Sequence, residues 1–271
     1  MNIHPTALIS PKAEIDSSAV IAPYCIIDGE VKIGAGTRVG AYSRIEGNVI
    51  IGSECNLAGW ASLGLAPQDI GYKGEATGVK IGDRVTLREF VTVHRGTVNG
   101  GGITVIENDC FLMCYVHIGH DCIISRGAIL VNGTTLGGHV KIHSGVNVSG
   151  FFLAHQYVEV GELAMISGMT GTRQSIPPYV IADGRPARIF RVNKVGLVRS
   201  GMERPVIRAI EEAYRLIRSG ERQEALLEID KSEYPEVRRI ADFYRNSKRG
   251  VVSFVSSDSE YPKEKVATIF D

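Results

Sequence analysis

Residues 3–39 read IHPTALISPKAEIDSSAVIAPYCIIDGEVKIGAGTRV, and every sixth position from Ile3 onward carries an aliphatic side chain. The series keeps its phase over eleven positions, namely Ile3, Ile9, Ile15, Ile21, Ile27, Ile33, Val39, Ile45, Ile51, Leu57 and Leu63. Four residues after each of the first ten comes a small or β-branched residue such as Ala19, Cys25 or Thr37. Because only 44% of the chain is hydrophobic, this run marks a true internal repeat.

A period of six residues favours stacked strands over a helix. Six residues turn an α-helix by about 600°, so the aliphatic side chains would fall on three faces and form no stripe. Along a strand they all face one way, since six is a multiple of two. Strands usually run about 3–10 residues, so the chain must turn after each hexad. The pattern therefore predicts a parallel β-helix, with aliphatic columns inside and about 18 residues, or three hexads, in each coil.

The repeat continues with two interruptions. Its phase returns at Ile81, Leu87 and Val93, shifts by one residue, and then runs from Ile106 to Ile166, which gives 25 hexads and about eight coils. The interruptions are residues 65–78 (LAPQDIGYKGEATG) and 96–104 (GTVNGGGIT). Excursions from a regular solenoid often lie on its binding face, and we expect that here.

Beyond Pro177-Pro178 the hydrophobic period becomes helical. Apolar residues from Val206 to Ile217 share one face before Gly220, a shorter helix is expected at 221–229, and a third is expected from Pro235 to about residue 247. Residues 250–271 are interpreted as a strand-like piece (VVSFV) and a loose tail. We therefore expect two domains, a β-helix over residues 1–190 and a helical domain with a C-terminal tail over residues 191–271.

Composition excludes several classes of protein. The 30 basic and 30 acidic residues balance, which does not favour a nucleic-acid partner. No apolar run reaches the roughly 18 residues of a transmembrane helix, and the first residues do not resemble a secretory signal, so we expect a cytoplasmic protein. Four of the five cysteines (Cys25, Cys55, Cys110 and Cys122) occupy the small position of a hexad and are expected to fill the core.

Five of the seven histidines lie within 39 residues: His117, His120, His139, His143 and His155. Adding 18 residues moves one coil along the same column, so His120 should stack on Gly138 beside His139, and then on Gln156 beside His155. Exposed histidines in turns are usually only solvated, but three imidazoles at one column predict a site. His4, His94 and His143 are given no role by their positions.

The expected chemistry at this column is acyl transfer without a covalent enzyme intermediate. His120, next to Asp121, can act as a general base near neutral pH, although alternating strand residues would point the two side chains apart unless the turn reorients one of them. Gly138 offers a backbone N–H that can stabilise an oxyanion. Two alternatives remain open, an inert scaffold and a zinc enzyme of carbonic-anhydrase type with His117, His120 and His139 as ligands.

Several motifs together resemble the acyl-carrier-protein-dependent UDP-N-acetylglucosamine 3-O-acyltransferases, a family of hexapeptide-repeat enzymes that begin lipid A biosynthesis. They are QDIGYKGE at 68–75, TVHRGT at 92–97, HIGHDC at 117–122, GGH at 137–139, AHQ at 154–156 and PPYVIADG at 177–184. The resemblance implies a left-handed parallel β-helix followed by a small helical domain, and a homotrimer with active sites between subunits. It also implies UDP-N-acetylglucosamine as acceptor, a 3-hydroxyacyl donor on the phosphopantetheine of acyl carrier protein, and no other cofactor or metal.

The same resemblance implies roles for individual residues. His120 is the expected general base and Gly138 the oxyanion donor. The expected substrate-binding residues are Gln68, Asp69, Lys73, His117, His139, His155, Gln156, Asn193 and Arg199. Gly168 is the expected determinant of acyl-chain length.

Three positions depart from the family's pattern: Gly71 stands where a lysine is usual, Val195 where an acidic residue is usual, and Ser200 where a second arginine is usual. Lys73 is a substitute for the lysine in this interpretation. A relative that acylates a 3-amino rather than a 3-hydroxyl group of a modified UDP-sugar is the alternative that these changes leave open.

Overall fold

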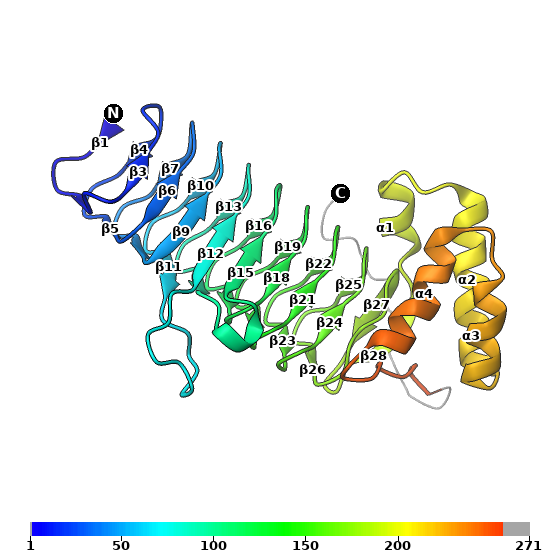
Figure 1. Ribbon diagram of the computed structural model, residues 1–271. Coiled ribbons are helices and arrows are strands. Elements are labelled where there is room, and N and C mark those ends of the chain that lie inside the picture. Colours follow the sequence, from blue (N-terminus) through cyan, green and yellow to red (C-terminus); the bar gives the residue numbers. More distant parts are fainter. Residues whose placement is uncertain (1, 257–271) are drawn as a thin grey trace.

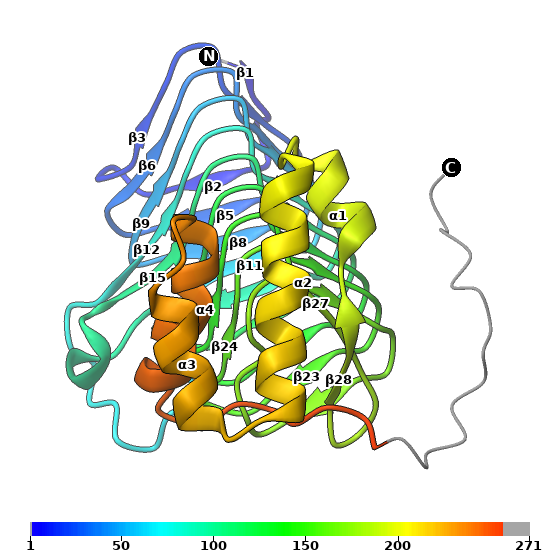
Figure 2. The same ribbon diagram turned by 90° about the vertical axis from the view of Figure 1, so that its right-hand side faces the viewer.

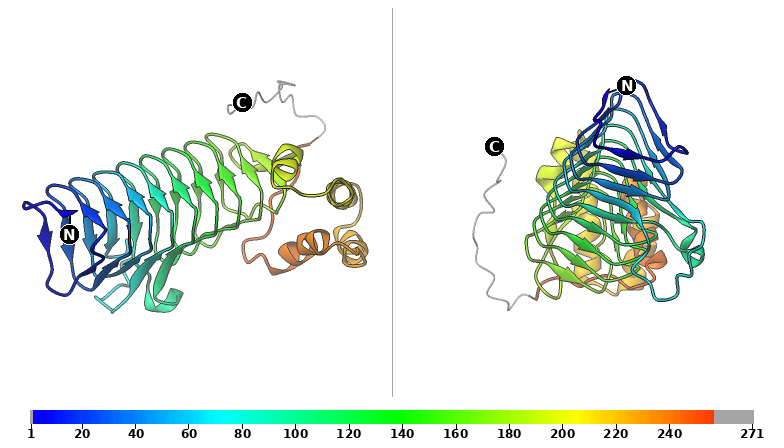
Figure 3. Two further views of the ribbon diagram at one scale, coloured as in Figure 1. Left: turned by 90° about the horizontal axis from the view of Figure 1, so that it is seen from above. Right: turned by 90° about the vertical axis from the view of Figure 1, so that its left-hand side faces the viewer.

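The computed structural model describes residues 2–256, which form a parallel β-helix with a group of helices at its C-terminal end (Figure 1). Seen from its N-terminal end, the β-helix is triangular (Figure 3). Each side of the triangle is one sheet, called A, B or C here. The predicted fold class, a left-handed parallel β-helix of hexapeptide repeats followed by a small helical domain, is confirmed.

Most strands are only two to four residues long and pair in parallel with strands of the coils before and after. Sheet A contains β1 (Asn2–Ile3), β4 (Val20–Ile21), β7 (Arg38–Val39), β10 (Asn56–Leu57), β13 (Thr86–Leu87), β16 (Phe111–Leu112), β19 (Ile129–Leu130), β22 (Asn147–Val148), β25 (Met165–Ile166), β27 (Val180–Asp183) and the antiparallel β28 (Arg188–Val192). Sheet B contains β2 (Leu8–Ile9), β5 (Ile26–Asp28), β8 (Arg44–Glu46), β11 (Ser62–Leu65), β14 (Thr92–His94), β17 (His117–Ile118), β20 (Thr135–Leu136), β23 (Leu153–Ala154) and β26 (Gly171–Thr172). Sheet C contains β3 (Glu14–Ile15), β6 (Val31–Ile33), β9 (Asn48–Ile51), β12 (Gly78–Ile81), β15 (Ile103–Ile106), β18 (Ile123–Ile124), β21 (Lys141–Ile142) and β24 (Glu159–Val160).

The first 24 strands follow the order A, B, C without exception and make the eight full coils that the repeat predicts. Paired residues are usually 18 apart, as in His117 with Thr135. In the two-residue strands from β1 to β25 the second residue carries the hexad aliphatic, and these side chains form the core; Ile21, Ile27 and Ile45 are at most 1% exposed. Burying each such side chain contributes about 1.5–3 kcal/mol, so the columns hold the coils together.

The small residues of the hexads fill the corners, as expected. The Cys25 thiol donates to the carbonyl oxygen of Gly40 at 3.2 Å, and Thr37 Oγ1 donates to the carbonyl of Gly52 at 2.7 Å. Burial raises the pKa of the Cys110 thiol to about 11 and that of Cys122 to about 12, which keeps both protonated at neutral pH. These cysteines are core fillers that also bond to the next coil.

Four α-helices follow the last coil: α1 (Lys194–Arg199), α2 (Arg204–Ser219), α3 (Arg222–Asp230) and α4 (Pro235–Asn246). Figure 2 shows α2 and α4 lying across the end of the β-helix. The last three helices match the sequence expectations, while α1 and the hairpin of β27 and β28 were not predicted. The VVSFV segment forms isolated parallel bridges through Val251 and Phe254, and the expected loose tail lies, from residue 257, outside the described residues.

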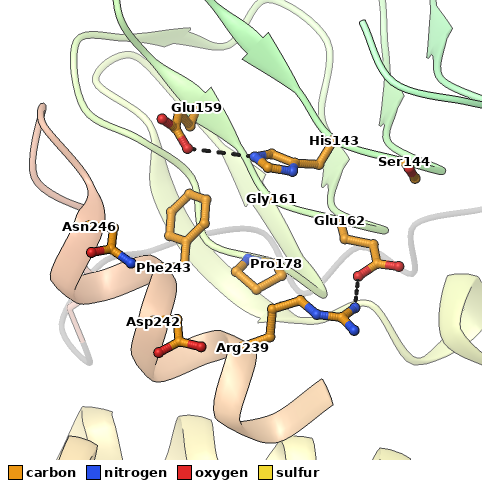
Figure 4. Close-up of a pocket in the computed structure, with 10 residues that line it drawn as sticks. All are labelled: His143, Ser144, Glu159, Gly161, Glu162, Pro178, Arg239, Asp242, Phe243 and Asn246. Carbon is orange, nitrogen blue, oxygen red and sulfur yellow. Dashed lines mark hydrogen bonds and ion pairs between the residues drawn. The ribbon is translucent and has the colours of Figure 1, made fainter. Parts of the chain in front are cut away.

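One polar network that joins the helices to the β-helix surrounds a buried tyrosine. Tyr179, which is fully buried, donates its hydroxyl to Glu162 at 3.2 Å, and Arg239 of α4 bonds both residues. A cavity of about 400 Å³ lies beside this network, where His143 faces Glu159 at 3.6 Å (Figure 4). The domain boundary expected at residue 190 stays a prediction; β28 ends at Val192 and α1 begins at Lys194.

Candidate active site at the B–C corner

Both interruptions of the repeat leave the β-helix at the same corner. The corner where the chain passes from sheet B to sheet C, called the B–C corner here, carries residues 66–77 between β11 and β12 and residues 95–102 between β14 and β15. The second insertion contains a short 3₁₀ helix, η1 (Val98–Gly100). Figure 1 shows the two loops, in cyan and teal, projecting from one edge of the β-helix. The turn with His120 follows in the next coil at this corner, so both excursions lie beside it in space.

His120 and Asp121 form a buried pair in that turn. Nδ1 of His120 lies 2.8 Å from Oδ2 of Asp121, and the two residues are 5% and 6% exposed. Asp121 adopts a left-handed backbone conformation (φ 60°), which turns its side chain toward its neighbour. Because a carboxylate only accepts hydrogen bonds, Nδ1 carries the proton and Nε2 presents its lone pair.

The insertion at residues 95–102 fixes the carboxylate of Asp121. Thr97 donates to it twice, from its backbone N–H at 2.9 Å and from Oγ1 at 2.7 Å. The backbone N–H of Asp121 in turn donates to Oγ1 of Thr104 at 2.8 Å. A Cβ at Gly96 would lie 2.7 Å from Oδ1 of Asp121, and one at Gly100 would collide with the carboxylate. The glycines of GTVNGGGIT therefore let this loop close over the pair.

Gly138 lies against the imidazole of His120. A Cβ at Gly138 would lie 3.0 Å from Cδ2 of His120 and closer still to Cε1 and Nε2. Within residues 2–256, the N–H of Gly138 donates to no acceptor, although its carbonyl accepts from Tyr157 at 3.1 Å. The lone pair of Nε2 and an unpaired N–H donor therefore share one small space.

Further rings lie at this corner. His139 meets His120 edge to face at 4.9 Å between ring centres and stacks on Tyr157 at 4.3 Å. Burial lowers the pKa of His139, against the opposing charge of Asp121, so its imidazole is neutral at pH 7. His117 bonds Oγ1 of Thr92 at 2.8 Å through Nδ1, and burial, followed by the charge of His94, lowers its pKa as well.

His94 belongs to the same cluster, although its position in the sequence gave it no role. Its ring centre lies 5.3 Å from that of His117. Nδ1 of His94 lies 2.7 Å from the carbonyl oxygen of Ala66 and ties β14 to the start of the first insertion. The TVHRGT motif was the signal that could have identified it.

The first insertion brings Asp69 toward the imidazoles. Asp69 accepts from the N–H of Gly71 at 2.7 Å, which closes a turn, and its charge acts to raise the pKa of His139. Gln68 and Lys73 lie on the same loop with exposed side chains. The backbone of Lys73 donates to Glu75 at 2.8 Å, and a Cβ at Gly71 would press on Oδ1 of Asp69 at 3.1 Å.

His155 and Gln156 extend the corner by one coil, as the 18-residue spacing predicts. Both are exposed, and Nη2 of Arg249 lies 3.3 Å from Nδ1 of His155. Arg249 also donates through Nε to the carbonyl oxygen of Arg173 at 3.1 Å. The sequence gave no signal for these arginines, because they come from the segment after α4 and from a coil beyond the histidine motifs.

Three expected site residues lie elsewhere in the chain. Gly168 is in the turn between β25 and β26, at the corner that joins sheets A and B. Asn193 caps α1, accepting from Gly196 at 3.1 Å and donating to the carbonyl of Leu163 at 2.9 Å. Arg199 ends α1, where its side chain is exposed. A single copy of the chain does not bring these residues to His120.

Within residues 2–256, one group of side chains has the composition and spacing of a metal site: His120, Asp121 and His139. His117, offered above as a zinc ligand, is not in it. Both oxygens of Asp121 already accept hydrogen bonds from Thr97, and Oδ2 also bonds His120. The donor set matches zinc, but a metal there would have to displace the contact that orients His120.

A β-helix of hexapeptide repeats with a buried His–Asp pair beside a glycine at one corner fits the class of hexapeptide-repeat transferases. The family model described as bacterial transferase hexapeptide (six repeats) matches residues 30–64 and 103–138, and the model described as UDP N-acetylglucosamine O-acyltransferase, domain 2, matches residues 176–252. Among the described residues, no helix has both the length and the apolar character of a membrane span.

The chain belongs to the acyl-[acyl-carrier-protein]–UDP-N-acetylglucosamine O-acyltransferase family. It is 44% identical over 253 residues to the member from Thermodesulfovibrio yellowstonii, covering 92% of this chain and 98% of the relative. The solved UDP-N-acetylglucosamine O-acyltransferase of Moraxella catarrhalis superimposes with a TM-score of 0.91 at 41% identity, over 93% of this chain and 100% of that one. The enzyme of Francisella novicida gives a TM-score of 0.90 at 33% identity, over 93% and 94% of the two chains.

Proposed function

We propose that this protein transfers a 3-hydroxyacyl chain from acyl carrier protein to the 3-hydroxyl of UDP-N-acetylglucosamine, the first step of lipid A biosynthesis, in the cytoplasm. The observation that carries the proposal is the buried His120–Asp121 pair, whose Nε2 faces Gly138, a residue whose N–H has no acceptor among the described residues. Family membership supplies the substrates, and the local geometry supplies a base and an oxyanion donor in contact with each other.

The base acts through Nε2 of His120. It accepts the proton of the acceptor hydroxyl as that oxygen attacks the thioester carbonyl carbon. Asp121 holds the proton on Nδ1 and stabilises the imidazolium that forms, as in other His–carboxylate pairs. When the tetrahedral intermediate collapses, the C–S bond breaks and the imidazolium returns the proton to the departing thiolate.

The N–H of Gly138 stabilises the negative charge on the former carbonyl oxygen. Because no protein acceptor among the described residues takes this hydrogen bond, the donor is free before the substrate arrives and needs no rearrangement. Removing one donor of this kind typically costs about 10²–10³ in kcat. Neither His120 nor Gly138 has to form a covalent bond with the acyl group.

The sugar nucleotide binds beside the base. Asp69, His117 and His139 face this corner and can hydrogen-bond hydroxyl and amide groups, while His155 and Gln156 extend the site by one coil. Gln68 and Lys73 are exposed on the first insertion. The neutral state of His139 and His117 suits them to hydrogen-bond an uncharged sugar.

Catalysis needs a second copy of the chain, which agrees with the expected homotrimer. Gly168 lies at a different corner from His120, and Asn193 and Arg199 lie beyond the last coil at the start of the helical part. If these residues contact the same substrate as His120, a neighbouring subunit must supply them, so the site lies between subunits.

Two other readings make different predictions. A 3-amino acceptor would be acylated faster than the 3-hydroxyl sugar and would yield an amide, which survives mild base while an ester is cleaved. A zinc enzyme would contain stoichiometric metal and lose it on substitution of His139, because His120, Asp121 and His139 form the one candidate group within residues 2–256.

The decisive experiment is His120→Ala, with His4→Ala as a matched control. His4 is an exposed histidine of the first coil, and its ring bonds Thr6 within the local turn. His120→Ala should keep its oligomeric state and lower acyl transfer by about 10²–10⁴, the usual contribution of a general base, while His4→Ala should match wild type. Full activity in His120→Ala, or bound zinc lost from His139→Ala, would overturn the proposal.

A further inference from the structure

Five aromatic side chains form a continuous stack at the corner where the chain passes from sheet A to sheet B, called the A–B corner here. One ring comes from each of five successive coils, and the set is called the aromatic ladder: Tyr24, Tyr42, Trp60, Phe90 and Tyr115. Neighbouring ring centres lie 4.9–5.5 Å apart, close to the separation of the coils themselves. All five residues share the left-handed turn conformation, and their side chains stand outside the β-helix.

The ladder presents a large apolar edge to its surroundings. Its rings are between 41% and 62% exposed, and at about 4.8 Å per coil the stack is on the order of 20 Å long. Monomeric proteins rarely expose contiguous apolar surface of this kind, and aromatic residues are enriched in protein interfaces. Stacking covers both faces of Tyr42, Trp60 and Phe90, so a sugar ring has no open face to stack on there. The edge therefore fits a protein surface.

The B–C corner of the chain carries a matching apolar group. Ile70 follows Asp69 in the loop at residues 66–77, and its side chain is fully exposed (100%). This loop and Trp60 belong to the same coil, since both lie between β10 and β12. Seen from the N-terminal end, the insertions project from one corner of the triangle (Figure 3). Sheet B separates that corner from the ladder, so a contact between them joins two copies of the chain.

The proposed function already brings these two corners together. Gly168 lies at the A–B corner and, in that proposal, contacts the substrate held by His120 at the B–C corner of another copy. The column of the ladder continues through Phe151 to Met169, beside Gly168. A contact between two different corners, repeated around a closed ring, is a heterologous interface. If the ring axis runs along the β-helix, equal coils of neighbouring copies lie at equal height. Gly168 is three coils beyond His120, about 14 Å, which an acyl chain lying along the axis can span.

We propose that the aromatic ladder binds the B–C corner of a second copy, with Ile70 of that copy seated against Trp60 and Phe90. Each copy thereby holds in place the loop that carries its neighbour's Asp69. The inference rests on the proposed function, from which it takes the pairing of the two corners. It goes beyond the expected homotrimer, because it assigns a surface to the contact and gives that surface a part in positioning the acceptor loop.

Cross-linking tests the contact directly. The background variant is C114S, because Cys114 is half-buried at the A–B corner while the other four cysteines are buried. After mild oxidation, W60C/I70C or I70C/F90C should give covalent dimers and trimers in a non-reducing gel. The matched control is Y24C/I70C, whose first cysteine lies on the ladder two coils from Trp60. At about 10 Å from the contact it is beyond the roughly 7 Å between Cα atoms that a disulfide allows, so this control should run as single chains.

Kinetics test whether the contact positions the loop. I70A and W60A should each raise the KM of UDP-N-acetylglucosamine roughly 3- to 10-fold, the effect of losing a small apolar contact, while kcat stays close to wild type. The double variant W60A/I70A should be no worse than the more severe single variant, because the two side chains form one contact. L227A removes an exposed leucine of α3 and is the matched control, which should behave as wild type.

Three results would overturn the assignment. They are the absence of a cross-link at both Trp60 and Phe90, equal cross-linking at Tyr24, and an unchanged KM in W60A. Losses that multiply in W60A/I70A would likewise show that the two side chains act separately. Cross-linking needs no catalysis, so if wild type transfers no acyl group the proposed function fails, while the gel still decides whether the ladder holds the loop of a second copy.

Discussion

Gly138→Ala tests whether the fit between Gly138 and His120 controls the rate. The backbone of Gly138 lies outside the left-handed region, so the substitution acts through its added methyl group alone. That methyl would lie 3.0 Å from Cδ2 of His120 and closer to Nε2, a separation that Cβ contacts do not tolerate. The imidazole must retreat by on the order of 1 Å, a displacement that can cost about 10²-fold in rate.

The assay is steady-state kinetics with the acyl-carrier-protein donor, read by mass spectrometry of the acylated nucleotide. We expect kcat to fall about 10²-fold while the thermal midpoint stays near that of wild type, because the methyl displaces a side chain at the edge of the core. Gly220→Ala is the control: this residue caps α2, and its Cβ would meet only the carbonyl oxygen of Leu216, at 3.4 Å. It should keep full activity.

A double-mutant comparison identifies the cause of the loss. If the methyl acts by moving His120, adding Gly138→Ala to His120→Ala should change the rate little, since the base is already gone. If the two losses multiply, the methyl acts on something other than the imidazole and the reasoning fails. Wild-type activity in Gly138→Ala would equally refute it.

Three further predictions follow from the same structure. Inactive His120→Ala and Arg199→Ala chains should recover part of the activity when they are refolded together, because a shared site would then combine intact halves; no recovery would place both residues in one subunit's site. Gly168→Met should fold normally, since a Cβ there meets only the carbonyl oxygen of Gly150 at 3.5 Å and Ser149 at 4.0 Å. In an assay with mixed acyl donors, this variant should form products with shorter acyl chains than wild type does. An unchanged chain length would exclude Gly168 as the length determinant. His143, followed by Lys141, lowers the pKa of Glu159, so this carboxylate stabilises the fold at pH values above its ordinary pKa of about 4.5 and loses that contribution as the pH falls through its lowered pKa. Glu159→Gln should therefore lower the free energy of unfolding in urea by about 1 kcal/mol or less at pH 7. If the difference in stability between Glu159→Gln and wild type does not narrow in acid, the assignment is wrong.

The sequence was sufficient to predict the β-helix because the six-residue spacing of its aliphatic residues alone determines which side chains point into the core. Every hexad aliphatic from Ile21 to Leu63 is buried, and the 18-residue spacing placed Gly138 on His120 before any coordinates. The helix α1 and the hairpin of β28 were not predicted, because they are too short to show a period in the sequence.

The site was predicted only in part, because its decisive contacts depend on turn conformation and on loops. Alternation along a strand separates the side chains of His120 and Asp121, but Asp121 occupies a turn with positive φ, which brings them together at 2.8 Å. His94 joins the cluster through a contact with Ala66, 28 residues earlier, and the repeat carries no information about that contact.

The unusual turn conformation does not itself mark the active corner. Non-glycine residues with positive φ recur at every corner, as at Tyr24 and Tyr42 between sheets A and B, so this conformation belongs to the fold. Those two rings are about half exposed and stack at 5.1 Å in contact with water. Asp121 adopts the same conformation and yet is almost wholly buried, and the difference is the loop at residues 95–102, which brings Thr97 onto its carboxylate. The B–C corner therefore becomes a low-dielectric site, where a fixed His–Asp pair has its full electrostatic effect, because an insertion covers the turn.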